Sequence, residues 1–388
     1  MSTLKVDAIR HNSATSDAIT TAADGTCTAK ITNNLSNRNL VINGAMQVAQ
    51  RGVSNTTVSG PGYYTVDRMR YSESSLGTTV IKQEQSTDSP DGFAFSFKST
   101  ITTAEGSVGA TDRFSPLNIR FEGQDFQQLQ YGTSGAKSVT LSFYVKSSVT
   151  GTYNVAFYRT ESTARIITDT YTINAANTWE YKTITINGDT SASITNDNAN
   201  RFELFFNAGA GSDVKSTDTS GSWQNYVAPI LGFGCNVNLQ NTLNATWQIT
   251  GVQLEVSDHA SDFEHLSFGD ELRRCMRYYE RTYPYGVALG GSNSFAGMIN
   301  QTGSSNGTGT MVVPIQYGVE KRVAPTLSAY NANNGNSGTW YVLRNGASGH
   351  NSVTIDQSST RIARLYFSVG ANWVSAAAEG HFIADAEL

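Results

Sequence analysis

The chain has 388 residues, of which only 15% are charged, well below the roughly 25% of an ordinary soluble domain. Its formal net charge is −5 and its pI is about 5.6, so no overall basic field favours nucleic acid as a partner. No apolar run approaches the roughly 20 residues of a membrane-spanning helix, which argues against membrane insertion.

The first 37 residues are short, polar and weakly patterned. The stretches TLKVDAI and GTCTAKI could each form one strand. A segment of this size cannot bury a hydrophobic core by itself. We therefore predict that residues 1–37 dock to a partner or to neighbouring copies of the chain.

Residues 38–267 carry the strongest strand signal. Apolar residues alternate with polar ones in four runs: Phe93, Phe95 and Phe97; Val139, Leu141, Phe143 and Val145; Tyr153, Val155 and Phe157; Phe202, Leu204 and Phe206. A period of two predicts strands with one buried and one wet face, which favours antiparallel sheets. Turn clusters separate the runs, so the fold class we predict is all-β, with an antiparallel jelly-roll or β-sandwich domain.

Residues 268–283 have a different pattern, with apolar residues at helical spacing and arginines between them. The apolar stripe consists of Leu272, Met276 and Tyr279. Ser267 followed by Asp270 fits a loose capping box, and Pro284 would end the helix. We predict one amphipathic linker helix over 268–283. Its stripe would pack on the jelly roll or on a second copy, and its arginines would face solvent or acids of a neighbouring subunit.

Strand patterns return in residues 284–388 and predict a second, smaller β-domain. The stretches 300–310 and 331–339 are rich in Gly, Ser and Asn and are predicted as exposed loops. The string GSSNG matches G-x-S-x-G with Ser305 as nucleophile. That motif needs a strand, a sharp turn and a helix around the serine, and a loop offers none. We predict no catalytic residue.

The sequence gives little indication of a metal site. Cys27, Cys235 and Cys275 form no CxxC or CxxH pair, so we predict free thiols rather than disulfides or zinc. The loops 86–92 and 195–201 could offer oxygen ligands to a structural calcium ion, but neither matches a calcium-loop motif. A further cluster consists of Asp258, His259, Asp262, Glu264 and His265. Because no helix aims these side chains together, we predict a solvated turn, no metal site and no cofactor.

Several stretches, in this order, resemble a family of bacteriophage tail-fibre-like virion proteins that is common in phages of marine bacteria. They are NRNLVINGAMQVAQRG (37–52), YYTVDRMRY (63–71), SVTLSFYVKSSVTGTYNVAFY (138–158), NTWEYKTITINGDTS (177–191), WQITGVQLEVSDHASDFEHLSFGDELRRCMRYYERTY (247–283) and ADAEL (384–388). The fifth stretch is the most specific, because its order and spacing are unusual. The resemblance covers about residues 37–283 and the last five; 284–383 is similar only in general character.

The resemblance implies a jelly-roll module akin to carbohydrate-binding modules, on a homotrimeric or otherwise multimeric virion appendage. It implies host recognition, or support of the particle that does so, and supplies no catalytic residues. Because the start of the chain has no apolar signal-peptide core, we expect synthesis in the host cytoplasm. We predict a non-enzymatic tail fibre that binds host-surface glycan, with other phage tail or virion proteins as partners of residues 1–37. Two alternatives stay open. One is a structural adaptor, connector or head-fibre protein without its own ligand. The other is a glycan-cleaving tailspike, which would need two close carboxylates.

Exposed aromatic side chains beside turns are the candidates for sugar binding, because their faces stack on the C–H face of a pyranose. The candidates are Trp223 and Tyr226 before the linker helix, and Trp340, Tyr341 and Trp373 after it. The last three make residues 284–388 the candidate receptor-binding domain. Trp179 and Trp247 stand inside strand patterns and are predicted to be core residues.

Overall fold

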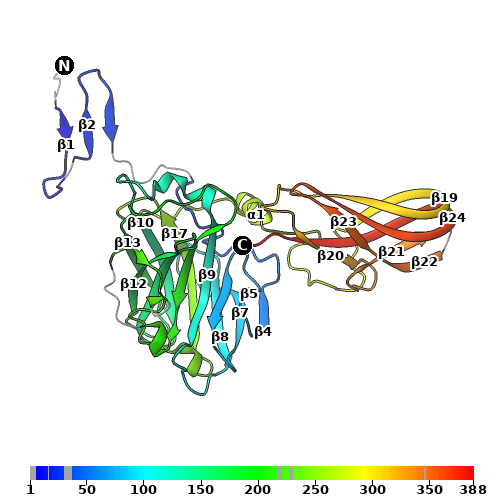
Figure 1. Ribbon diagram of the computed structural model, residues 1–388, viewed down its shortest axis with the longest axis horizontal. Helices are drawn as coiled ribbons and strands as arrows, with labels where there is room; N and C mark the ends of the chain where they lie inside the picture. The colour runs from blue at the N-terminus through cyan, green and yellow to red at the C-terminus, as the bar shows by residue number, and fades with distance from the viewer. Residues whose placement is uncertain (1–5, 16, 30–36, 216–220, 228–229, 345–346) are drawn as a thin grey trace.

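The computed structural model describes residues 6–15, 17–29, 37–215, 221–227, 230–344 and 347–388, and it is almost wholly β-structure. Figure 1 shows three parts: a small sheet near the N-terminus, a β-sandwich, and an arm of long strands, with helix α1 between sandwich and arm. The C-terminus returns from the arm to this boundary. No helix in the described part of the chain is long and apolar enough to cross a membrane.

The N-terminal sheet has three short antiparallel strands, β1 (Ala8–Ile9), β2 (Ile19–Thr21) and β3 (Cys27–Ala29). Of the side chains described between residues 6 and 27, none is buried. A sheet of this size without a core is not stable alone. Docking of residues 1–37 to a partner stays a prediction, and residues 1–5, 16 and 30–36 lie outside the described part.

The sandwich consists of two antiparallel sheets. The six-stranded sheet has the order β13-β10-β17-β8-β7-β4, from β4 (Ser54–Val58), β7 (Val80–Ser86), β8 (Ser96–Thr103), β10 (Val139–Ser147), β13 (Glu180–Ile186) and β17 (Thr246–Glu255). The eight-stranded sheet has the order β16-β12-β11-β14-β9-β6-β5, with β15 beside β9. Its strands are β5 (Gly62–Tyr63), β6 (Arg70–Ser74), β9 (Arg113–Glu122), β11 (Gly151–Arg159), β12 (Arg165–Ile173), β14 (Asn200–Asn207), β15 (Gly209–Ala210) and β16 (Gln224–Asn225). Among the described residues, 3-10 helices lie in the connections at Gly123–Leu129, Ser212–Val214 and Leu239–Asn241.

The core lies between the two sheets, where the alternating patterns placed it. Phe143 of β10 and Phe206 of β14 meet across the sandwich with ring centroids 5.2 Å apart, and both are fully buried. Trp247 is also fully buried, and its Nε1 donates a hydrogen bond to Tyr171 Oη at 3.1 Å. The predicted antiparallel all-β sandwich is therefore confirmed, and so is the core position of Trp247.

Helix α1 (Phe268–Met276) is shorter than predicted. Ser267 caps it as expected, because its Oγ accepts a hydrogen bond from the Asp270 backbone N–H at 3.2 Å. The predicted helix over 277–283 is wrong, since residues 279–281 form strand β18 (Tyr279–Arg281) and pair with the end of β24 (Ile362–Asp385). Hydrogen bonds to a strand far along the chain override the local helical pattern there.

The buried face of α1 is also one position off the predicted stripe. Glu271 and Cys275 are the buried helix residues, whereas Leu272 and Met276 are half-buried. Tyr279 is buried, but in β18 rather than in the helix. The arginines were predicted to face solvent or another subunit. Arg277 instead binds Glu122 of the same chain, which ties the end of α1 to the sandwich.

The arm is a seven-stranded antiparallel sheet organised around one long strand, β24. Its other strands, besides β18, are β19 (Ile299–Gln316), β20 (Thr326–Asn331), β21 (Thr339–Arg344), β22 (Ala347–Ser352) and β23 (Thr354–Ser358). The predicted loop at 300–310 is wrong, because it belongs to β19 and pairs with β24 through several register shifts. Partner hydrogen bonds offset the weak strand propensity of its glycines. Residues 332–338 connect β20 and β21, as predicted, but only residues 336–338 are exposed, whereas Ala332 and Gly335 are buried.

Candidate functional site

Two tyrosines lie side by side on the outer face of the six-stranded sheet. Tyr144 of β10 is paired in register with Tyr181 of β13, and their ring centroids are 4.9 Å apart. Because the neighbouring Phe143 and Val145 are buried in the core, alternation directs Tyr144 outward. Tyr181 is 48% exposed. The sheet thus presents two neighbouring rings, tilted by 47° to each other, on its outer face.

Three rings from outside the strands extend this surface. Phe93, before β8, lies 5.6 Å from Tyr144 and 5.1 Å from Phe263 between ring centroids. His265 lies 4.8 Å from Phe263. We call Phe93, Tyr144, Tyr181, Phe263 and His265 the aromatic groove. They line a cavity of about 640 Å³, a size typical of ligand pockets.

Gly251 of β17 makes room for the groove. Two residues of β17 stand opposite one residue of β10 here, which is a β-bulge, and Gly251 has φ +62°. A Cβ atom on Gly251 would lie 2.7 Å from the Phe93 ring and 3.2 Å from the Tyr144 ring. The bulge therefore needs glycine both for its backbone conformation and for the close approach of the two rings.

Polar groups line the same cavity. They are the carboxylates of Asp91 and Asp262, which are exposed, and the hydroxyls of Ser142 and Thr183. Aromatic faces bind the apolar face of a sugar ring, and carboxylates and hydroxyls bind its hydroxyl groups. The groove thus combines the two kinds of side chain that a glycan site needs.

Trp179 lies beside the groove, two residues before Tyr181. Its Nε1 donates to Asp88 Oδ1 at 3.2 Å, and Lys146 Nζ donates to Asp88 Oδ2 at 2.7 Å. Burial acts to raise the pKa of Asp88, but hydrogen bonds from Lys146, Trp179 and Gln248 outweigh it and lower the pKa. Trp179 is half-buried on the outer face, so its predicted core position is wrong.

Trp340 was predicted to be an exposed sugar platform, and this is wrong. Its side chain has no exposed surface and packs in the core of the arm near Phe367. The indole lies so close to Gly380 of β24 that a Cβ there would be 2.4 Å away. Trp340 and Val342 point to the same, buried face of β21, and β21 lies between β24 and β22 in the sheet. Trp340 is therefore buried even though a cluster of turn residues precedes it in the sequence.

Trp223 and Tyr226 are half-buried and do not line the aromatic groove. Trp223 Nε1 donates to the Asn187 carbonyl at 2.8 Å, and its ring packs 5.7 Å from Tyr131. The Tyr226 ring packs 4.9 Å from Tyr158. These contacts hold the β16 region on the sandwich and leave only part of each ring accessible.

The two remaining candidates lie on the arm. Tyr341 is half-buried, with its ring 5.6 Å from His350 of β22. Trp373 belongs to β24 and is paired with Ser305 of β19, but its side chain lies outside the described part of the chain. Ligand binding by either residue stays a prediction. The structure does not gather the predicted candidates into one site.

The aromatic groove was missed, although part of it left a signal. In SVTLSFYVK, Tyr144 is the one aromatic residue among the positions that alternation directs toward solvent. A large aromatic side chain on the solvent-facing side of a strand is unusual. Phe93 was instead grouped with Phe95 and Phe97 on a buried face. That grouping is wrong for Phe93, because β8 begins only at Ser96 and no sheet fixes the alternation before it.

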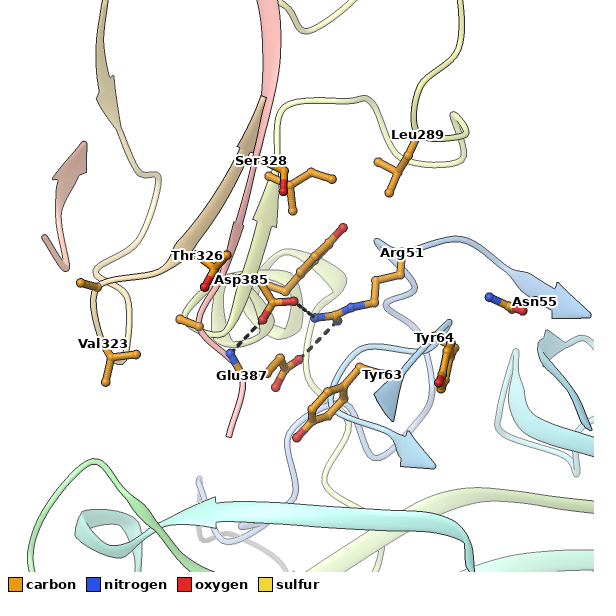
Figure 2. Close-up of a pocket in the computed structure, with 14 residues that line it drawn as sticks. Arg51, Asn55, Tyr63, Tyr64, Leu289, Val323, Thr326, Ser328, Asp385 and Glu387 are labelled. Carbon is orange, nitrogen blue, oxygen red and sulfur yellow. Dashed lines mark hydrogen bonds and ion pairs between the residues drawn. The ribbon is translucent and has the colours of Figure 1, made fainter. Parts of the chain in front are cut away.

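A second cavity, of about 720 Å³, lies between the sandwich and the arm. Figure 2 shows its lining, including Arg51, Asn55, Tyr63 and Tyr64 from the sandwich and Leu289, Thr326, Ser328 and Asp385 from the arm. We call it the inter-domain cavity. Arg51 points across it toward Asp385 and Glu387, at 3.3 Å from a carboxylate oxygen of each.

The end of the chain is held at this boundary by arginines of the sandwich. Glu387 forms ion pairs with Arg51 and Arg68, whose side chains are 8% and 2% exposed, and we call these three residues the terminal clasp. The Arg51 and Arg68 guanidinium groups lie over the rings of Tyr279 and Tyr278, at 3.7 and 3.6 Å from the centroids. Charge pairing and ring contact thus fix the start and the end of the arm to the sandwich.

Asp67 lies next to the clasp and is almost fully buried. It accepts hydrogen bonds from the Gln50 backbone N–H at 2.9 Å and from Gln50 Nε2 at 2.5 Å. Burial raises the pKa of Asp67 to about 6, although Arg51 and the two hydrogen bonds from Gln50 act to lower it.

In the described part of the chain, no three His, Cys, Asp or Glu side chains come together as a possible metal site. Within the histidine cluster, His259 bonds Asp258 at 2.7 Å while His265 belongs to the groove. In the two Asp/Asn-rich loops, Asp88 binds Lys146 and Asp197 binds Arg201. Each of these acids therefore already has a partner within the chain.

No protein-family model matches the chain, and no curated protein matches it either. Solved structures do show similarity. The enzymatically active domain of tailspike protein 4 of bacteriophage CBA120 is 13% identical, with a TM-score of 0.31 over 57% of this chain. The match covers only 22% of that tailspike chain, about a fifth of its length.

Two further similar structures are sugar-related by name. A CBM4 module is 13% identical with a TM-score of 0.27, and the match covers 52% of this chain and 98% of the module. A putative sugar binding protein from Bacteroides thetaiotaomicron is 16% identical with a TM-score of 0.30, and the match covers 56% of this chain and 100% of that one.

Proposed function

We propose that this chain is a glycan-binding component of a phage virion appendage and that the aromatic groove is its binding site. The observation that carries the proposal is the contiguous row of rings on the outer face of a sheet, because an apolar patch of this kind, bordered by polar groups, is typical of a binding site. The resemblance of residues 37–283 to tail-fibre-like proteins supports the virion setting.

In the proposed complex, a pyranose stacks on Tyr181, the most exposed ring of the groove. Its hydroxyl groups bond to Asp91, Asp262, Ser142 and Thr183 around it. An open groove of this kind gives weak single-site affinity. A homotrimer would combine several weak contacts into tight attachment through a high effective concentration.

The test is calorimetric titration of the full chain with oligosaccharides released from the host surface. Tyr181→Ala removes the stacking surface without opening the core, and we expect roughly a fivefold higher Kd, about 1 kcal/mol. Tyr341→Ala on the arm is the matched control and should leave Kd unchanged. Weaker binding by Tyr341→Ala together with normal binding by Tyr181→Ala would move the site to the arm and contradict the proposal.

Binding without cleavage is part of the proposal. Incubating the chain with the same oligosaccharides should release no new reducing ends, since a groove that serves only for attachment must leave its ligand intact. Release that disappears with Asp91→Asn or Asp262→Asn would instead establish the tailspike alternative.

The connector alternative has one observation in its favour, the N-terminal sheet without buried side chains in its described residues. We propose that this segment attaches the chain to the virion or to its own copies, while the groove still binds glycan. A purely structural connector would bury the groove in the assembled particle, so imaging the virion separates the two.

A further inference from the structure

We propose that the inter-domain cavity is a second binding site, for one neutral sugar residue that contacts the sandwich and the arm at once. This proposal is independent of the aromatic groove, since the two cavities share no lining residue. The cavity volume of about 720 Å³ is within the usual range of ligand pockets, and such pockets form preferentially at domain interfaces.

Both walls offer groups suited to a sugar. Thr326 and Ser328 of β20 line the arm side, and among the described residues neither hydroxyl has a hydrogen-bond partner. Asn55 and the rings of Tyr63 and Tyr64 line the sandwich side. The set therefore provides hydroxyl and amide groups for hydrogen bonds together with aromatic surface for a C–H face.

The charges of the cavity indicate a neutral ligand. Arg51 is the cationic group in the lining, and Asp385 and Glu387 already neutralise it. The Asp385 side chain is 45% exposed, so its carboxylate remains accessible to ligand hydroxyls. Glu387 is also paired with Arg68, so the accessible charge of the cavity is the Asp385 carboxylate, which repels an anionic sugar.

Because the walls come from two domains, a sugar bound here would stabilise their relative arrangement. Ligand that binds only when both walls are in place raises the stability of the folded, docked state. The cavity would then link glycan capture to the orientation of the arm, which the groove on the sandwich face cannot do.

The test uses full-length Tyr144→Ala/Tyr181→Ala protein, in which the groove is disabled. Saturation-transfer NMR with glucose, galactose, mannose and N-acetylglucosamine should still show binding of at least one of them. Adding Ser328→Trp, which fills the cavity, should abolish that signal. Thr326→Val, which removes one hydroxyl at constant size, should weaken binding roughly fivefold, and thermal unfolding should show that each variant is folded.

Three outcomes would overturn the inference. One is a folded groove-disabled protein that binds none of the four sugars. Another is a signal that survives Ser328→Trp. The last is stronger binding of glucuronate than of glucose. Each differs from failure of the groove proposal, which is judged from the effect of Tyr181→Ala on oligosaccharide affinity in the otherwise unmodified chain.

Discussion

Asp67 is the residue where burial and charge compete most directly. Its pKa rises from the ordinary 3.8 to about 6 mainly because burial disfavours the charged form. The folded state therefore binds this proton more tightly than the unfolded state. The stabilisation that protonated Asp67 provides is complete below about pH 4 and is lost as the pH rises through about 6.

We predict that Asp67→Asn removes this pH dependence. The rise in pKa from 3.8 to about 6 corresponds to about 3 kcal/mol. The free energy of unfolding of the natural chain, minus that of the variant, should therefore fall by about 3 kcal/mol between about pH 3 and pH 7. Urea unfolding at several pH values measures it. A difference that is flat or that rises with pH would contradict the assignment.

Gly251 allows a second prediction at the residue scale. Gly251→Ala places a Cβ 2.7 Å from the Phe93 ring and an alanine at φ +62°. We expect a loss of about 1 kcal/mol in stability and a displaced Phe93, hence weaker oligosaccharide binding. Gly338→Ala on the arm is the control, since φ there is also positive, at +72°, but no atom lies within 4 Å of the added Cβ. Equal effects of both changes on affinity would show that strain alone is responsible.

At the same scale, the sequence predicts inward-facing side chains better than exposed ones. Phe143 and Phe206 follow from alternation, because a strand buried on one face has a single phase available. Trp340 does not, since proximity to a turn in sequence says nothing about which strands flank it in the sheet. The groove joins four separate segments, and only tertiary structure brings Phe93 and Phe263 together.

At the element scale, α1 and β18 connect the sandwich to the arm through Glu122 at the end of β9. Arg277 Nε donates to Glu122 Oε1 at 2.7 Å, and Tyr278 Oη donates to the same oxygen at 2.6 Å. Glu122 has no exposed surface. This buried carboxylate is costly to disturb, because Tyr278 would lose its acceptor away from water and the partly exposed Arg277 would lose its counter-charge.

We predict that Glu122→Gln lowers the free energy of unfolding by about 2–3 kcal/mol, since the buried ion pair is lost while the shape is kept. Glu320→Gln, which breaks the exposed pair with Arg361, should leave stability unchanged. Guanidinium unfolding of both variants provides the comparison. Equal stability of the two would mean that the contact of β9 with the end of α1 is energetically neutral.

The same elements show where local pattern stops determining structure. The start of α1 is predictable because Ser267 caps it through a contact three residues away. Its end is not, because β18 forms only when the terminal part of β24 lies beside it, about a hundred residues later in the chain. The glycine-rich half of β19 is a strand for the same reason. Local signals are reliable where the partner is also local.

At the scale of the whole molecule, the question is whether the arm has a fixed orientation on the sandwich. The terminal clasp indicates that it does. Arg322 adds hydrogen bonds to the carbonyls of Ala386 and Glu387, both at 2.9 Å, and its Nη1 donates to the Asn198 carbonyl of the sandwich at 2.8 Å. The last residues of the chain thus contact both the sandwich and the arm. The arm therefore keeps a fixed orientation relative to the sandwich.

We predict that Glu387→Gln releases the arm. The side chains of Arg51 and Arg68 are almost fully buried, and removing their shared counter-charge should cost about 3 kcal/mol. Because the sandwich and the arm have separate cores, each should stay folded while their junction loosens. Small-angle scattering should then show a larger radius of gyration, and the amides of β18 should exchange faster. Asp356→Asn, which breaks an exposed pair with Arg364 on the arm, should change neither measurement. An unchanged radius and unchanged exchange in Glu387→Gln would show that strand pairing alone orients the arm.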